Sequence, residues 1–142
     1  MNILLVRPHT DDKDISKVMP LGLVAIATVL KREGYNPKIV DLRLSESPQS
    51  DLRKAIFEFD PDVVGIGLMT VESDWAFKLD KEIKEINHNV PIIFGGPHCA
   101  HEPEFILHNP NVDMMVIGEA ELTIVELIDA IKNKRDVATV KG

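Results

Sequence analysis

The stretch Ile3-Leu4-Leu5-Val6 decides the fold class of this chain. It is apolar without interruption, which is typical of a strand in a parallel sheet that helices cover on both faces. After it in the sequence, four further short apolar runs alternate with longer segments that have helical periodicity. The predicted strands are Asn2–Val6, Pro37–Asp41, Asp62–Leu68, Val90–Phe94 and Asp113–Ile117.

The alternation predicts an α/β fold with a doubly wound, five-stranded parallel sheet. Right-handed crossovers favour the flavodoxin-like strand order 2-1-3-4-5, with helices on both faces in a three-layer αβα arrangement. In such folds ligands bind outside the carboxyl ends of the strands, near the point where the strand order reverses. We therefore expect function to lie in the loops that follow the strands.

Residues that typically begin or end helices indicate where the helices lie between these strands. Pro20 opens the first and Gly34 follows its end, Ser50 or Asp51 caps the second, and Glu72 or Ser73 caps the third. The first helix, from Leu21 to Leu30, has no charged face, so we expect another part of the protein to cover it. In the third helix we expect Trp75, Leu79, Ile83 and Ile86 to share the core face, with Asp80, Lys81 and Lys84 turned elsewhere.

Composition excludes several classes of protein. With 142 residues, of which 44% are hydrophobic, the chain is long enough for one domain with a sizeable core. A net charge of -7 argues against a nucleic-acid partner, and no segment resembles a signal peptide or a membrane span. The single cysteine, Cys99, excludes an internal disulfide framework and a cluster held by several cysteines. We expect a cytoplasmic protein.

The loop after the first strand, from Arg7 to Met19, carries His9 with Asp11, Asp12 and Asp14. These residues could form a metal site or the phosphorylation pocket of a response regulator, but a solvated acidic loop is favoured. A response regulator would also need an acceptor aspartate at the end of the third strand. That strand ends instead in Gly67-Leu68-Met69-Thr70.

The loops after the third and fourth strands are rich in small residues. Gly67 and Thr70 could let a large ligand approach the backbone, or could simply relieve crowding and cap a helix. Gly95-Gly96-Pro97-His98 could receive a flat ligand tail, and Gly96→Leu should block it without unfolding the domain. His98 and His101 flank Cys99 without a recognised zinc spacing, so no metal ligand is predicted.

The loop after the fifth strand reads Gly118-Glu119-Ala120-Glu121. Both carboxylates favour the N-terminus of the helix that follows, from Leu122 to Lys134. Glu119 could instead accept hydrogen bonds from the amides of a ligand or of a neighbouring domain. No nucleophile or histidine accompanies these carboxylates, so no catalytic residue is predicted and an independent hydrolase is not expected.

Four motifs in this order resemble the cobalamin-binding domain of cobalamin-dependent radical S-adenosylmethionine (SAM) enzymes. They are Met19-Pro20-Leu21-Gly22-Leu23, Gly65 to Thr70, Gly95 to His98 and Gly118 to Glu121. The resemblance runs from the first strand to Ile131. It implies a corrin ring over the carboxyl ends of the strands, with the nucleotide tail near the third and fourth loops. The cofactor-binding residues that it implies are Pro20, Leu21, Gly22, Gly67, Leu68, Met69, Thr70, Gly95, Gly96, Pro97, His98, Gly118, Glu119 and Glu121.

One motif of the wider cobalamin family is missing. The methyltransferase and mutase branch carries D-x-H-x-x-G, whose histidine binds cobalt. Around His9 the pattern fails, because Arg7 stands where the aspartate belongs and Asp12 where the glycine belongs. Radical SAM relatives commonly lack this ligand too. We therefore assign no cobalt-ligating histidine.

The resemblance also implies a larger parent protein. The C-x-x-x-C-x-x-C motif that holds a 4Fe-4S cluster, together with the SAM site, would lie in a following barrel domain. We expect residues 1–134 to form the cobalamin domain and 135–142, with the pattern Val-Ala-Thr-Val, to begin a linker or strand toward that barrel. The full-length protein would then catalyse a radical reaction such as methyl transfer.

The alternative is a non-catalytic flavodoxin-like module that binds a flavin, a nucleotide or a protein partner without cobalamin. A flavin would favour a phosphate-binding loop rich in glycine or hydroxyls after the first strand. The segment from Arg7 to Met19 has only Thr10 and Ser16 among many negative charges.

Overall fold

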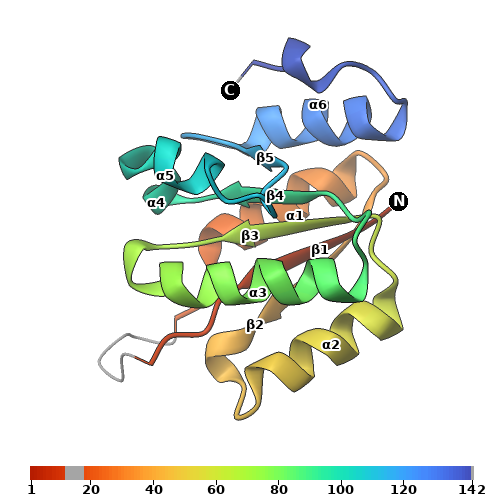
Figure 1. The fold of residues 1–142 in the computed structure, drawn as a ribbon. Coiled ribbons are helices and arrows are strands. Elements are labelled where there is room, and N and C mark those ends of the chain that lie inside the picture. Colours follow the sequence, from red (N-terminus) through yellow and green to blue (C-terminus); the bar gives the residue numbers. More distant parts are fainter. Residues whose placement is uncertain (12–17, 142) are drawn as a thin grey trace.

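The computed structural model of the protein describes residues 1–11 and 18–141. Its centre is a five-stranded parallel sheet of order β2-β1-β3-β4-β5, which confirms the predicted fold class (Figure 1). β1 pairs with both β2 and β3, so the strand order reverses beside it. The strands are β1 (Asn2–Arg7), β2 (Asn36–Asp41), β3 (Val63–Gly67), β4 (Ile92–Gly95) and β5 (Met114–Met115).

Helices cover both faces of the sheet. In Figure 1 α2 and α3 lie in front of it, whereas α1 and α6 lie behind. The connection from β4 to β5 contains two short helices, because Pro103 opens a new helix directly after the first one ends. The helices are α1 (Leu21–Arg32), α2 (Pro48–Phe59), α3 (Ser73–Ile86), α4 (Pro97–His101), α5 (Pro103–Leu107) and α6 (Glu121–Lys132).

The uninterrupted apolar run of β1 supplies two separate cores. Successive side chains on a strand point to opposite faces, so Leu4 and Val6 join the core under α2 and α3. Ile3 and Leu5 join the core under α1 and α6. All four side chains are buried. A continuous apolar run is therefore what a strand covered on both faces requires.

Three local predictions differ from the structure. α2 begins at Pro48, earlier than a cap at Ser50 or Asp51 would allow, because proline is well suited to the first helical turn. β5 pairs with β4 only over Met114–Met115. The segment expected to begin a strand instead forms a 3-10 turn at Val137–Thr139, which Asp136 caps by accepting a hydrogen bond from the Ala138 amide.

The prediction for α3 was wrong at Asp80. Leu79 and Ile83 lie in the core as expected, but Trp75 is only half-buried and Ile86 is exposed. Asp80 is fully buried, because Asn109 and Asn111 approach its carboxylate and donate hydrogen bonds of 2.6 and 3.1 Å. Helical period alone could not reveal those partners.

α1 is partly covered within the chain, because α6 packs beside it. Leu21, at its start, remains 72% exposed. Among the described residues no helix is both long and apolar enough to cross a membrane.

Candidate functional site

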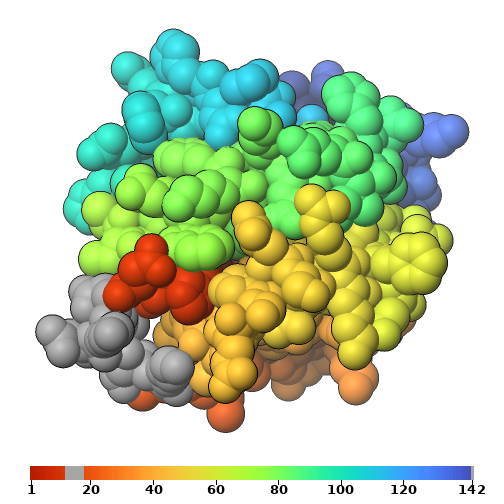
Figure 2. All heavy atoms as spheres, turned by 60° about the horizontal axis from the view of Figure 1, so that its bottom comes forward, coloured from red at the N-terminus to blue at the C-terminus, as the bar shows by residue number. Residues whose placement is uncertain are grey.

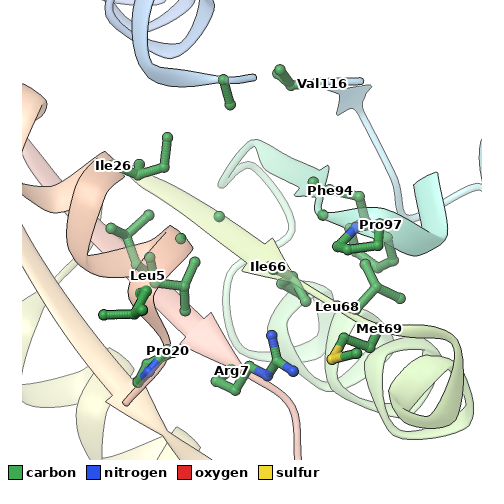
Figure 3. A pocket seen from close by; sticks show the side chains of 18 of the residues that line it. Leu5, Arg7, Pro20, Ile26, Ile66, Leu68, Met69, Phe94, Pro97 and Val116 are labelled. Carbon is green, nitrogen blue, oxygen red and sulfur yellow. The ribbon is translucent and has the colours of Figure 1, made fainter. Parts of the chain in front are cut away.

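A cavity of about 650 Å³ opens at the carboxyl edge of the sheet (Figure 3). It lies where β1 and β3 adjoin, which is the switch point that the strand order predicts for a ligand. Its wall comes from the loops after β1, β3, β4 and β5 together with the start of α1 and of α6. The cavity size is within the usual range for small-molecule sites, roughly 300 to 1,000 Å³.

The cavity brings together most of the residues that the sequence singled out. Thr70 and His98 do not line it. The predicted residues on the wall are Pro20, Leu21, Gly22, Gly67, Leu68, Met69, Gly95, Gly96, Pro97, Gly118, Glu119 and Glu121. Whether any of them contacts a ligand stays a prediction.

Most of the wall is apolar, and sequence analysis missed this part of it. Leu5, Ile26, Phe94 and Val116 point their side chains into the same space (Figure 3). Leu5 and Phe94 come from buried strands, so their sequence signal is that of ordinary core residues. Their position near the strand ends is what exposes part of the core to the cavity.

Two of the glycines on the wall lie against other parts of the protein. A Cβ on Gly67 would lie 2.7 Å from a methyl group of Leu23. Gly96 has φ of +104°, and a Cβ there would lie 2.6 Å from the carbonyl oxygen of Leu68. Any side chain at Gly96 strains the backbone, which argues against the expectation that Gly96→Leu blocks a ligand without disturbing the fold.

Two further glycines on the wall, Gly22 and Gly95, leave open space. A Cβ on Gly22 would meet no atom within 4 Å, and one on Gly95 would lie 3.8 Å from the Val116 carbonyl. Gly22 lies within the first turn of α1, where a larger residue also fits the backbone. A side chain at this position would project toward the cavity without a clash.

Arg43 lines the cavity and was not predicted as a site residue. It is buried and donates to both carboxylate oxygens of Asp41, at 2.9 and 2.6 Å, and to the Val18 carbonyl at 2.8 Å. Burial alone would raise the pKa of Asp41, but the hydrogen bonds and charge of Arg43 outweigh it and hold that pKa below its ordinary value. This pair fixes the segment that leads into α1.

Arg7 is a second cationic side chain on the wall that sequence analysis did not single out. It ends β1, and its Nε donates to Glu72 at 2.8 Å. Glu72 is fully buried and accepts a further hydrogen bond of 2.9 Å from the Met69 amide. The pair bridges the ends of β1 and β3, so it fixes the two loops that meet at the switch point.

Thr70 and His98 contact each other outside the cavity wall. His98 Nδ1 lies 3.3 Å from the Thr70 hydroxyl, and the ring is buried. Its Nε2 has no hydrogen-bond partner among the described residues. The contact joins the loop after β3 to α4, behind the glycines Gly95 and Gly96.

The two carboxylates after β5, those of Glu119 and Glu121, both line the cavity. Glu119 is exposed, and Glu121 is half-buried in the first turn of α6. A carboxylate at Glu121 favours the helix N-terminus. Glu119 is the acidic side chain here that is open to solvent.

Residues 8–11, at the start of the loop after β1, pack on the side of the sheet where α2 and α3 lie. They lie between the end of β2 and α3 (Figure 2). His9 contacts the Leu42 carbonyl at 3.1 Å and the edge of Trp75, and Trp75 donates to Asp11 at 3.0 Å. Asp12 and Asp14 lie outside the described residues.

Within residues 1–11 and 18–141 no three histidine, cysteine or acidic side chains are grouped to hold a metal ion. Cys99 is fully buried, which raises the pKa of its thiol to about 11. The thiol is therefore protonated at neutral pH.

Comparison with known proteins agrees with the fold. Residues 15–128 match the family described as B12 binding domain. Among curated proteins, an uncharacterized methyltransferase of Pyrococcus horikoshii, PH0819, is 39% identical over the whole chain. The chain spans 32% of the length of that relative.

Solved structures of a radical SAM methyltransferase, TsrM from Kitasatospora setae, share the architecture. The form with cobalamin and a [4Fe-4S] cluster bound aligns with 99% of this chain and 26% of its own, at a TM-score of 0.78 and 25% identity. The isolated receiver domain of the response regulator RcsB from Salmonella enterica also aligns, with a TM-score of 0.64 and 17% identity over 96% of this chain and 91% of its own. At that identity the likeness is one of fold alone. β3 ends here in glycine, without the acceptor aspartate of a receiver.

Proposed function

The chain belongs to the B12 binding domain family, and we propose that it is the cobalamin-binding module of a larger radical SAM enzyme. The cavity at the carboxyl edge of the sheet would hold the cofactor. The observation that carries this proposal is the open, largely apolar cavity at the switch point between β1 and β3.

The chemistry of the wall fits a corrin. A corrin is a broad ring with an apolar face and a rim of amide side chains. The wall offers apolar side chains such as Leu5 and Val116 for the face, and the Arg7 guanidinium and the Glu119 carboxylate for polar groups at the edge. Gly22 and Gly95 leave the wall open where side chains would otherwise fill it.

The predicted site residues divide into two groups under this proposal. Residues on the cavity wall, such as Leu68, Met69 and Pro97, would contact the ligand. Gly67 and Gly96 would act indirectly, by allowing Leu23 and the Leu68 carbonyl to approach. Thr70 and His98 would support the loops from behind.

The activity belongs to the whole protein. We propose methyl transfer, because PH0819 is described as a methyltransferase and TsrM as a radical SAM methyltransferase. Cobalamin, when bound, supplies a cobalt centre that can carry a methyl group. SAM and a 4Fe-4S cluster would bind in a barrel domain of the same polypeptide, beyond a boundary near residue 134, and no catalytic residue is assigned to this chain.

We also propose that the protein is cytoplasmic and that this domain binds neither nucleic acid nor a membrane. The net charge of -7 and the single cysteine support this proposal.

Titration with hydroxocobalamin tests the proposal, followed by the visible spectrum and by calorimetry, with flavin mononucleotide as the comparison ligand. We expect saturable binding of the corrinoid and none of the flavin. Binding of the flavin alone would instead support the alternative of a module without cobalamin.

Gly22→Leu tests the location of the site. The new side chain would enter the cavity, so we expect at least tenfold weaker binding of hydroxocobalamin, with thermal unfolding unchanged or slightly raised because leucine favours a helix over glycine. Thr28→Leu is the matched control, since Thr28 is exposed on the same helix and away from the cavity wall. Unchanged affinity in folded Gly22→Leu would contradict the assigned cavity.

A further inference from the structure

One edge of the Arg7 guanidinium, the one that carries Nε, is held by the protein. Its Nε donates to Glu72, whose carboxylate is fixed in turn by the Met69 amide. The Arg7 side chain is only 13% exposed, and that of Glu72 is 0% exposed. The guanidinium therefore has a defined position at the floor of the cavity.

The other edge of this guanidinium faces the cavity. Figure 3 shows Arg7 reaching from the end of β1 toward the space beside Ile66 and Met69. A guanidinium has five N–H donors, and the contact with Glu72 uses the one on Nε. Within residues 1–11 and 18–141 no hydrogen-bond acceptor is recorded for Nη1 or Nη2 of Arg7.

Arg43, which also lines the cavity, is different. Its donors go to the carboxylate of Asp41 and the carbonyl of Val18. Arg43 thus has partners in the protein, whereas Arg7 presents two donor groups to a largely apolar space. Two donor groups that open into a largely apolar cavity point to an acceptor on a ligand.

We propose that Arg7 is a specificity-determining residue that donates from its Nη groups to a carboxamide oxygen on the rim of the corrin ring, with Glu72 as its positioning residue. This inference rests on the proposed function. Glu72 balances the positive charge of Arg7, and Glu119 and Glu121 add negative charge to the same wall. A neutral carbonyl acceptor therefore suits the site better than the phosphate of the nucleotide tail.

Arg7→Lys separates this role from a structural one. A lysine can keep the ion pair with Glu72, but its single nitrogen cannot also present a fork of donors to the cavity. We expect a melting temperature close to that of the unaltered protein, and about tenfold weaker binding. The loss should be equal for hydroxocobalamin and for dicyanocobinamide, which lacks the nucleotide tail but keeps the ring amides.

Arg53→Lys is the matched control. Arg53 pairs through Nε with Glu82, a buried carboxylate, at the contact between α2 and α3 and away from the cavity. We expect this variant to bind both corrinoids as the unaltered protein does. If Arg7→Lys fails to fold, Arg7→Met combined with Glu72→Gln removes the donors without leaving a buried charge.

The outcomes are distinct. Unchanged affinity for both corrinoids in a folded Arg7 variant overturns the role of Arg7 while the proposed function stands. A loss with hydroxocobalamin alone overturns the assignment to the ring and points to the tail phosphate. If the unaltered protein binds neither corrinoid, the proposed function is overturned, and this inference with it.

Discussion

Glu72 and Asp80 are two buried carboxylates in one stretch of chain, and they are held in opposite ways. Both are 0% exposed. Glu72 lies behind two residues of the cavity wall, and the Arg7 guanidinium and the Met69 amide contact it. Asp80 lies in α3, away from the cavity, and receives hydrogen bonds from the neutral amides of Asn109 and Asn111.

The absence, among the described residues, of a cation in direct contact with the Asp80 carboxylate is reflected in the pKa of Asp80. Burial raises its pKa to about 6, because the two asparagine amides and the more distant charge of Lys84 offset only part of the cost of removing the charge from water. Lys84 itself is paired with Asp113 at 2.7 Å. Glu72, beside the cavity, is thus held by a cation in direct contact, whereas Asp80, in α3, is held by neutral amides.

Removing the cation from Glu72 should have the largest effect. Arg7→Met leaves a buried carboxylate without its charged partner, which we expect to lower the free energy of unfolding by about 3–5 kcal/mol in urea titrations at pH 7.5. Adding Glu72→Gln should recover most of that loss, because the amide oxygen can still accept from Met69. If the double variant is as unstable as the single one, the charge of Glu72 is not the cause.

Sequence reasoning predicted the fold well, since the apolar runs, their alternation with helices and the handedness of crossovers all lead to one architecture. It failed where contacts between residues far apart in the sequence determine the structure. Asp80 reads as a surface residue of α3 until Asn109 and Asn111, from the loop before β5, are placed against it. β5 reads as a longer strand, but its pairing with β4 extends over only two residues, Met114 and Met115.

The sequence predicted which loops form the candidate site, but it did not predict what each residue in those loops does. Glycines after strands mark positions where backbone or ligand approaches closely, and sequence cannot say which. Gly96 serves a protein contact, whereas Gly22 borders open space. Arg7 carried a signal, as a cation directly after a buried strand, but its importance depends on Glu72, which the sequence placed only as a helix cap.

Asp80→Asn should have the next largest effect, through pH. The folded pKa of Asp80 is raised, so the folded state binds a proton more tightly than the unfolded state does, and the stability of the unaltered protein falls as pH rises from about 4 to about 6. This group alone contributes a fall on the order of 3 kcal/mol, which is nearly complete above about pH 6. We expect the difference in unfolding free energy between Asp80→Asn and the unaltered protein to change by that amount across this window. A difference that does not vary with pH would contradict the raised pKa.

Asn111→Ala should have the smallest effect and would sharpen the comparison. It removes one of the two amides that donate to Asp80, so the ionised carboxylate is less well satisfied and its pKa should rise further. We expect a loss of about 1 kcal/mol above pH 7, where Asp80 is charged, and a smaller loss near pH 4, where it is neutral. Urea titrations of Asn111→Ala at the two pH values measure the difference, and equal losses at both would show that Asn111 supports the loop before β5 without acting on the charge of Asp80.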